Sequence, residues 1–147
     1  MNAAETREFA TRYRELWREH ALDALIELHH PACELHVVGT EPVHGRTAIR
    51  EAFATLFEQF PDLYFEGRAL HAGEDHFVSE WIVTGTPRSE DVAVFGLRGE
   101  PSEETLRCHG TDVFTLSDGL IRSKHSYFDT LAIAQQLSGT REIARTP

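Results

Sequence analysis

The sequence predicts an α+β fold in which N-terminal helices back one curved, mostly antiparallel sheet. Apolar residues recur at helical spacing up to Pro61, and extended segments with β-branched and aromatic residues follow it. The 147 residues, 41% hydrophobic and 26% charged, suffice for one domain with a real core. We therefore expect a single domain over 1–147, with its core at about 8–137 and a flexible tail at 138–147.

Three helices are expected before Pro61. The apolar face of the first is expected to contain Phe9, Tyr13, Leu16 and Trp17, which are spaced i, i+4, i+7 and i+8. A short second helix at 22–28 ends before Pro31, and a third runs from about 47 to 60, where Pro61 stops it. The segment LAIAQQL near the end of the chain predicts one more short helix.

Five strands are expected, at 34–39, 62–71, 75–86, 105–116 and 120–129. The strongest hairpin signal is Asp118-Gly119, because a two-residue type I′ turn needs positive φ at both positions. A regular ladder from that turn pairs Asp112 with His125 and Gly110 with Tyr127. Period-2 alternation then places one set of side chains on a single face: Asp112, His125, Tyr127 and Asp129. The polar segment 87–105 is interpreted as either a lid or a long hairpin.

The charge of the chain excludes several classes of function. The formal net charge is −10, and the basic residues are thirteen arginines and a single lysine, Lys124. Such a chain repels nucleic acids and anionic membranes, so we expect neither as a partner. No run approaches the length of a membrane span and the first residues carry charges, so we expect a cytoplasmic protein. Nine histidines raise the alternative of a metal site, but no ligand spacing such as HExxH occurs, and we expect none.

Four segments resemble the SnoaL-like polyketide cyclase and ketosteroid isomerase superfamily. They are LDALIELHHPACELHVVG (22–39), EPVHGRTAIREAF (41–53), GTDVFTLSDGLIRSKHSYFD (110–129) and DTLAIAQQL (129–137). The resemblance implies the cone-shaped fold of nuclear transport factor 2, in which the sheet wraps around the N-terminal helices and encloses an apolar pocket. It also implies a site without a cofactor, and a homodimer formed through the outer face of the sheet.

The resemblance implies roles for individual residues. Tyr13 and Asp112 fall where the steroid isomerases keep two hydrogen-bond donors to the substrate carbonyl, the second a protonated aspartic acid, a pair that serves as a known example of pKa tuning. His36 occupies the position of their aspartate base, and Asp129 that of the acid/base aspartate of the anthracycline-type cyclases. His125 stands where those cyclases more often have tryptophan.

Each of these residues also has a structural alternative. Tyr13 lies on an apolar helical face and fits a core, while Asp112 fits a structural hydrogen bond with His125. Asp129 precedes a helix and fits an N-cap, and His36 fits the rim of the pocket. The residues expected to line the pocket, which fit a filled core equally well, are Phe53, Phe57, Trp81, Phe114 and Tyr127.

The sequence thus favours a cofactor-independent enzyme. It would remove a proton next to the carbonyl of a small apolar compound and stabilise the enolate, as an isomerase, aldol-type cyclase or dehydratase does. The alternative is a module of the same fold that binds a small hydrophobic ligand or dimerises without chemistry. A third reading is an epoxide hydrolase, which needs arginine beside paired aspartates, but the expected register turns Arg107 and Arg122 away from Asp112.

Overall fold

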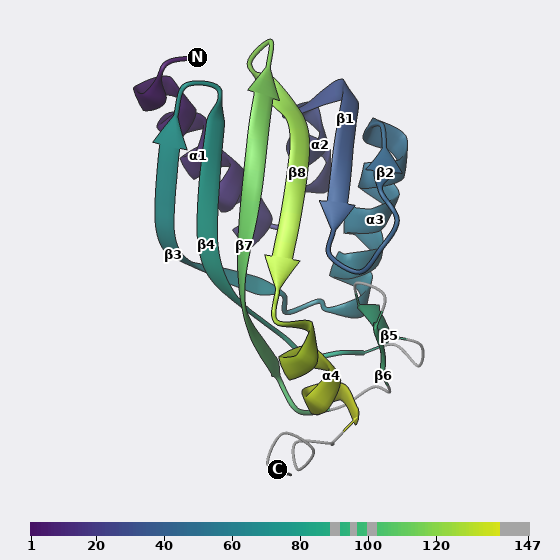
Figure 1. Cartoon of the computed structure of the whole chain (residues 1–147). Coiled ribbons are helices and arrows are strands. Elements are labelled where there is room, and N and C mark those ends of the chain that lie inside the picture. Colours follow the sequence, from purple (N-terminus) through teal and green to yellow (C-terminus); the bar gives the residue numbers. More distant parts are fainter. Residues whose placement is uncertain (89–91, 95–96, 100–102, 139–147) are drawn as a thin grey trace.

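The computed structural model describes residues 1–88, 92–94, 97–99 and 103–138 (Figure 1). Its helices are α1 (Ala3–Arg18), α2 (Leu22–Glu27), α3 (Arg46–Gln59) and α4 (Thr130–Ser138). Its strands are β1 (His29–Val37), β2 (Val43–His44), β3 (Tyr64–Gly73), β4 (His76–Gly85), β5 (Val92–Val94), β6 (Leu97–Gly99), β7 (Leu106–Ser117) and β8 (Leu120–Phe128). The expected tail falls almost entirely on 139–147, which lie outside the described residues.

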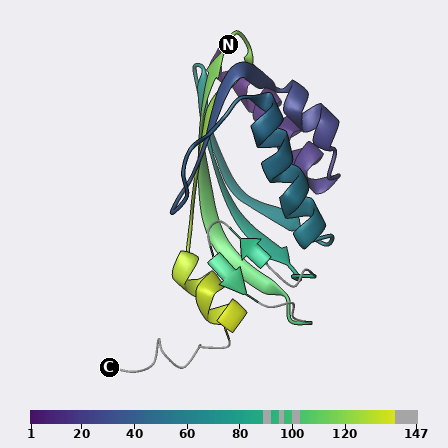
Figure 2. The same ribbon diagram turned by 90° about the vertical axis from the view of Figure 1, so that its right-hand side faces the viewer.

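Six strands form one curved sheet in the order β2-β1-β8-β7-β4-β3. β1 runs parallel to β8, and the other neighbours in this sheet are antiparallel. Figure 2 shows α1, α2 and α3 against the concave side of the sheet, while the opposite side carries none of these three helices. This arrangement confirms the predicted α+β class and the mostly antiparallel sheet.

Helix α1 begins where the sequence provides a complete cap. The Asn2 side chain accepts from the Glu5 backbone, and the Glu5 side chain accepts from the Asn2 backbone, which satisfies two amides at the start of the helix. Tyr13, Leu16 and Trp17 lie on the buried face, as their spacing predicts. Their burial holds α1 against the sheet, where it contacts β3 and β4.

The strand boundaries after Pro61 agree with the sequence to within about two residues. The largest difference lies earlier, in β1, which begins at His29 rather than near residue 34 and passes through Pro31. Pro31 is exposed at a point where the register with β8 is irregular, so its missing N–H leaves no regular ladder bond unmade. The short β2 was not expected. Within 87–105, β5 and β6 form an antiparallel pair, as the hairpin alternative requires.

The β7–β8 hairpin corrects the predicted register. Asp118 and Gly119 have φ values of 54° and 73°, as a type I′ turn requires, and Leu116 pairs with Ile121 next to it. Beyond that pair a β-bulge interrupts the ladder, because Thr115 pairs with Ser123 and leaves Arg122 as an extra residue. The expected pairing of Asp112 with His125 is therefore wrong.

The bulge reverses the faces of the remaining β8 residues. Asp112 pairs with Ser126 and His125 with Val113, so Asp112 and His125 point to opposite sides of the sheet. Ile121 and Lys124, three residues apart, are both buried, whereas strict alternation would have turned Lys124 outward. One inserted residue thus directs Lys124 and Ser126 toward the helices, and His125 and Tyr127 away from them.

No helix in the described part of the chain is long and apolar enough to cross a membrane.

Candidate active site

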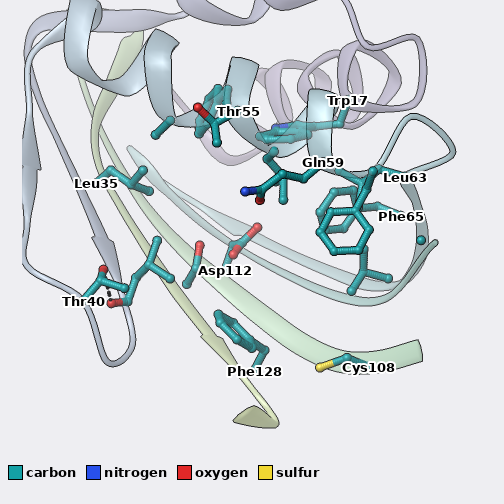
Figure 3. Close-up of a pocket in the computed structure, with 18 of the residues that line it drawn as sticks. Trp17, Leu35, Thr40, Thr55, Gln59, Leu63, Phe65, Cys108, Asp112 and Phe128 are labelled. Atoms are coloured by element: carbon teal, nitrogen blue, oxygen red, sulfur yellow. Dashed lines mark hydrogen bonds between the residues drawn. The ribbon is translucent and has the colours of Figure 1, made fainter. Parts of the chain in front are cut away.

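A cavity of about 470 Å³ lies between α3 and the concave face of the sheet (Figure 3). Apolar side chains such as Leu35, Phe53 and Trp81 make up most of its wall. Exposed residues, among them Glu41 and Thr55, also line it, so the cavity opens to solvent. Its volume suits a small, mainly apolar organic molecule.

Buried polar residues form a row across the concave face of the sheet, and two of them, Asp112 and Ser126, line the cavity. Ser79 on β4, Asp112 on β7 and Ser126 on β8 pair across three neighbouring strands, and each is less than 10% exposed. Figure 3 shows the Asp112 side chain pointing into the cavity, toward Gln59 of α3. Asp112 and Ser126 are therefore held by strands at the centre of the sheet, where regular secondary structure positions side chains well.

Asp112 faces a buried cation. Lys124 Nζ lies 3.8 Å from Asp112 Oδ2, and both residues line the cavity. The distance suits an ion pair but exceeds the length of a hydrogen bond. Asp112 Oδ1 is buried and has no hydrogen-bond partner among the described residues. Each member of the pair thus keeps bonding capacity that a ligand can use.

Aromatic rings surround the Lys124 ammonium group. Its Nζ lies 4.5 Å from the ring centre of Trp17, 5.1 Å from that of Phe53, and within 5.6 Å of those of Tyr13 and Phe114. The ring faces and Asp112 stabilise the cation, whereas desolvation favours the neutral amine. Burial is the largest influence, and it lowers the pKa of Lys124 below its usual value.

A second cavity, of about 30 Å³, adjoins the same pair. Asp112, Lys124, Ser79, Tyr13 and Trp81 are among its lining residues. A cavity of this volume can hold water. Trp81 Nε1, like Asp112 Oδ1, is buried without a hydrogen-bond partner among the described residues. The ion pair therefore has space for an organic ligand on one side and for water on the other.

Trp81 stands between two glycines on the neighbouring strands, one of which lies directly under its ring. Gly67 on β3 and Gly110 on β7 pair with Trp81 from either side. A Cβ atom on Gly110 would lie 2.1 Å from the Trp81 ring, so the indole covers space that any other residue would fill. Gly110 thus leaves room for the indole, which borders both cavities.

Tyr13 is engaged away from the larger cavity. His29 Nδ1 lies 2.8 Å from the Leu25 carbonyl and must donate to it, so Nε2 of the neutral ring accepts from the Tyr13 hydroxyl at 3.4 Å. Burial raises the pKa of Tyr13 and lowers that of His29 to about 4. The Tyr13 ring borders the smaller cavity, but its hydroxyl already has a partner.

The structure separates the other sequence-predicted residues from the cavity. His36 and His125 pair across β1 and β8 and stack at 4.3 Å on the convex face, where His36 Nε2 contacts Glu34 at 3.1 Å. Burial, followed by the charge of His36, lowers the pKa of His125. The Asp129 carboxylate accepts from the Ala132 backbone and so serves as the N-cap of α4.

The expected pocket residues divide into four groups. Phe53 and Trp81 line the larger cavity, and Phe114 lines only the smaller one. Phe57 packs against Trp17 and stacks on His20 instead. Tyr127 is 52% exposed on the convex face, because the bulge turns it outward.

Lys124 is the functional candidate that sequence reasoning missed. A signal was present, since it is the only lysine beside thirteen arginines. Lysine can lose its proton and act as a base or nucleophile, whereas arginine stays protonated in proteins. A metal centre gains no support, because no group of three or more potential ligands is assembled within the described ranges.

Comparison with known proteins identifies the relatives of this chain. No curated protein matches it in sequence. A proposed SnoaL-like polyketide cyclase from Jannaschia sp. CCS1 matches in structure with a TM-score of 0.79 at 23% identity, covering 92% of this chain and 93% of the other. A proposed polyketide cyclase from Xanthomonas campestris pv. campestris reaches 0.83 at 16% identity, covering 93% and 99%.

SalBIII, an epoxide hydrolase/cyclase-like enzyme of pyran ring formation in the polyether salinomycin, matches with a TM-score of 0.73 at 22% identity, covering 88% of this chain and 94% of its own. At such low identities these structures establish the shared fold. The family model of the SnoaL-like polyketide cyclases matches residues 7–137. The chain therefore belongs to the SnoaL-like polyketide cyclase family.

Proposed function

We propose that this protein is an enzyme of the cyclase type, which binds a small apolar carbonyl compound in the larger cavity and catalyses proton transfer next to the carbonyl group. One observation carries the proposal. A carboxylate and an amine, Asp112 and Lys124, lie 3.8 Å apart at an otherwise mainly apolar cavity of about 470 Å³. A pocket that only held a hydrophobic ligand would not need two buried ionisable groups.

The pair supplies both functions that the reaction needs. Asp112 Oδ1, which has no partner in the described part of the chain, can accept the proton from the carbon next to the carbonyl. Lys124 stabilises the negative charge that develops on the carbonyl oxygen, and this interaction is strong because the apolar wall excludes water. The Trp81 N–H, which has no partner among the described residues, is a further donor on a side chain that borders the same small cavity as the pair.

This assignment keeps Asp112 from the residues that the family resemblance implies, and adds Lys124. Tyr13 donates to His29, the histidines at 36 and 125 lie on the convex face, and Asp129 caps α4. We therefore leave these four out of the proposed catalytic group. SalBIII supports the proposal because it is a cyclase-like enzyme with the same fold. Its role in pyran ring formation is described for SalBIII alone.

Hydrogen exchange at carbon tests the proposal without knowledge of the natural substrate. We expect the protein to accelerate exchange of α-protons of 2-tetralone, a bicyclic ketone, in deuterium oxide, as followed by proton NMR. Asp112→Asn should lower the rate by about 100-fold, a typical loss when an acid/base group is removed. Glu66→Gln, which changes an exposed carboxylate on β3, should leave the rate unchanged.

Two outcomes would decide against the proposal. Exchange at the buffer rate with both 2-tetralone and acetophenone contradicts proton transfer as the function. If those ketones nevertheless bind, the chain is instead a binding module of the same fold. Full activity in Asp112→Asn contradicts the assigned base.

We also propose that two copies of the chain pair through the convex face of the sheet. Helices α1, α2 and α3 leave that face uncovered (Figure 2). Tyr127 on β8 exposes half of its surface there, beside the stacked pair of His36 and His125. An exposed aromatic side chain in such a position is typical of protein interfaces.

A further inference from the structure

The amine of Lys124 is buried, which is unusual for a lysine side chain. Lysine is almost never fully buried unless it is paired, yet Lys124 is only 6% exposed. It lies on the inner side of β8 because of the bulge at Arg122, and it borders both cavities. Its partner Asp112 lies too far away to hold it by a hydrogen bond.

We propose that Lys124 is a nucleophile that forms an imine with the carbonyl carbon of the substrate. The proposal rests on the proposed function and deepens it, because it states how the carbonyl compound is activated. Lysine amines act as nucleophiles when an apolar pocket desolvates them. The rings of Trp17 and Phe53 provide that environment, and the open cavity gives a ketone access to Nζ.

The pair contains the protons that imine formation requires. The Lys124 ammonium first transfers a proton to Asp112, which leaves a neutral amine and a carboxylic acid. The amine lone pair then forms the C–N bond while the C=O π electrons move to oxygen, and a proton passes from nitrogen to that oxygen. Asp112 protonates the hydroxyl group, the C–O bond breaks, and water leaves. The products are an iminium ion, an Asp112 carboxylate and one water.

The same carboxylate continues the reaction. The positive iminium nitrogen withdraws electrons, so the neighbouring C–H becomes acidic, and Asp112 removes that proton to give a neutral enamine. Hydrolysis by one water reverses imine formation and returns the amine. The smaller cavity of about 30 Å³ borders both Asp112 and Lys124 and has room for that water. A water there would also relay the proton across the 3.8 Å between Oδ2 and Nζ.

Burial of the amine supports this chemistry. Desolvation lowers the pKa of Lys124, so more of the amine is neutral near pH 7 than for an exposed lysine. Asp112 opposes that effect but also returns the proton when it is needed. A permanently charged pair held only for stability would be expected to show direct hydrogen bonds, which the 3.8 Å separation does not provide.

Reductive trapping tests the imine on the unmodified protein. The chain contains two primary amines, Lys124 and the α-amino group of Met1, so a label can be attached at only these two sites. We expect 2-tetralone with sodium cyanoborohydride to add one ketone, less its oxygen, to the peptide containing Lys124 in preference to that of Met1. Benzoylacetone, a 1,3-diketone, should form the corresponding enaminone with a new near-ultraviolet absorption band.

Variants relate the imine to catalysis. Lys124→Arg keeps a cation but cannot form an imine, and we expect it to lose the Lys124 label and at least tenfold of the α-exchange rate. Lys124→Met serves the same purpose if arginine does not fit, and the melting temperature of each variant shows whether it folds. Peptide mapping of the unmodified chain needs neither variant.

The possible failures are distinguishable. Catalysed exchange with label only on Met1 overturns the imine but leaves the proposed function standing. Label on Lys124 with full exchange in Lys124→Arg also overturns it, because the amine is then outside the reaction path. If neither catalysed exchange nor a label on Lys124 is observed, both proposals are overturned.

Discussion

At the scale of single residues, burial of the Asp112–Lys124 pair costs folding free energy. Desolvation costs several kcal/mol for each ion, and mutual attraction compensates only when geometry is good and the remaining polar atoms are bonded. Here the closest approach is 3.8 Å, and Asp112 Oδ1 has no partner among the described residues. Two apolar side chains of similar volume would fill the same space without this cost. The pair is therefore better explained by chemistry than by stability.

The lowered pKa of His29 makes the stability of the protein depend on pH. Burial holds its pKa at about 4, below the value of 6.5 for an exposed histidine. Between these pH values the unfolded chain binds a proton that the folded protein excludes, so stability rises with pH across the window and is lost as the pH falls toward 4. The full difference corresponds to about 3 kcal/mol of unfolding free energy.

Urea denaturation at several pH values measures this effect. His29→Gln should flatten the dependence of the unfolding free energy on pH between about 4 and 6.5, whatever it does to the stability at pH 7. His109→Gln, an exposed histidine on β7, is the matched control and should keep the slope of the unmodified protein. An unchanged slope in His29→Gln would show that this residue does not stay neutral in the fold.

At the scale of the elements, the β7–β8 hairpin contains one feature that the sequence predicts and one that it does not. The turn was predictable because Asp118-Gly119 has a strong conformational signature. The bulge at Arg122 was not, because none of its neighbours is a glycine or proline that would mark an extra residue. That one residue inverted the predicted face of His125 and Tyr127 and concealed the inward position of Lys124.

Helical elements were easier to predict because their signals are redundant. The first helix has an apolar stripe at helical spacing, and the third ends two residues before Pro61, which cannot continue a helix. Asp112 was identified because the family resemblance places a hydrogen-bond donor to the substrate at this position. Lys124 was not identified, because a basic residue in an antiparallel strand ordinarily points to solvent and only the register reveals otherwise.

In strand β7, the close approach of Gly110 to Trp81 allows the effect of a substitution to be predicted. A Cβ atom there would lie 2.1 Å from the Trp81 ring, which is itself packed at the cavity wall. Gly110→Ala must therefore displace the indole, and the overpacking should lower the unfolding free energy by about 1–3 kcal/mol. Denaturation followed by tryptophan fluorescence measures the loss, and the native-state spectrum should shift because Trp81 moves.

Gly67→Ala is the matched control for that substitution. Gly67 pairs with Trp81 from the other side, but the atoms in the way belong to the flexible end of the Arg14 side chain. Arg14 can move aside, so we expect a smaller loss than for Gly110→Ala. Equal losses for the two variants would contradict the role of Gly110 as the site of close indole approach.

At the scale of the whole molecule, the two faces of the sheet differ in their side chains and in what covers them. The concave face and α3 leave a cavity of about 470 Å³ rather than a filled core, with the ionisable pair held by the central strands. The convex face bears the stacked histidines and Tyr127. Because strand residues alternate between faces, the bulge that directs Lys124 into the cavity also directs Tyr127 outward. The proposed active site and the proposed dimer interface therefore depend on the same residue insertion.

This coupling leads to a prediction about assembly. If two copies pair through the convex face, sedimentation of the unmodified protein should give a dimer at micromolar concentrations. Tyr127→Asp places a charge on that face and should shift the protein toward monomer, because an unpaired charge buried in an interface is costly. Tyr64→Asp alters a comparably exposed tyrosine at the start of the edge strand β3, beside Arg18 of α1, and should remain dimeric. A monomeric unmodified protein, or equal dissociation of both variants, would rule out the convex face around Tyr127 as the interface.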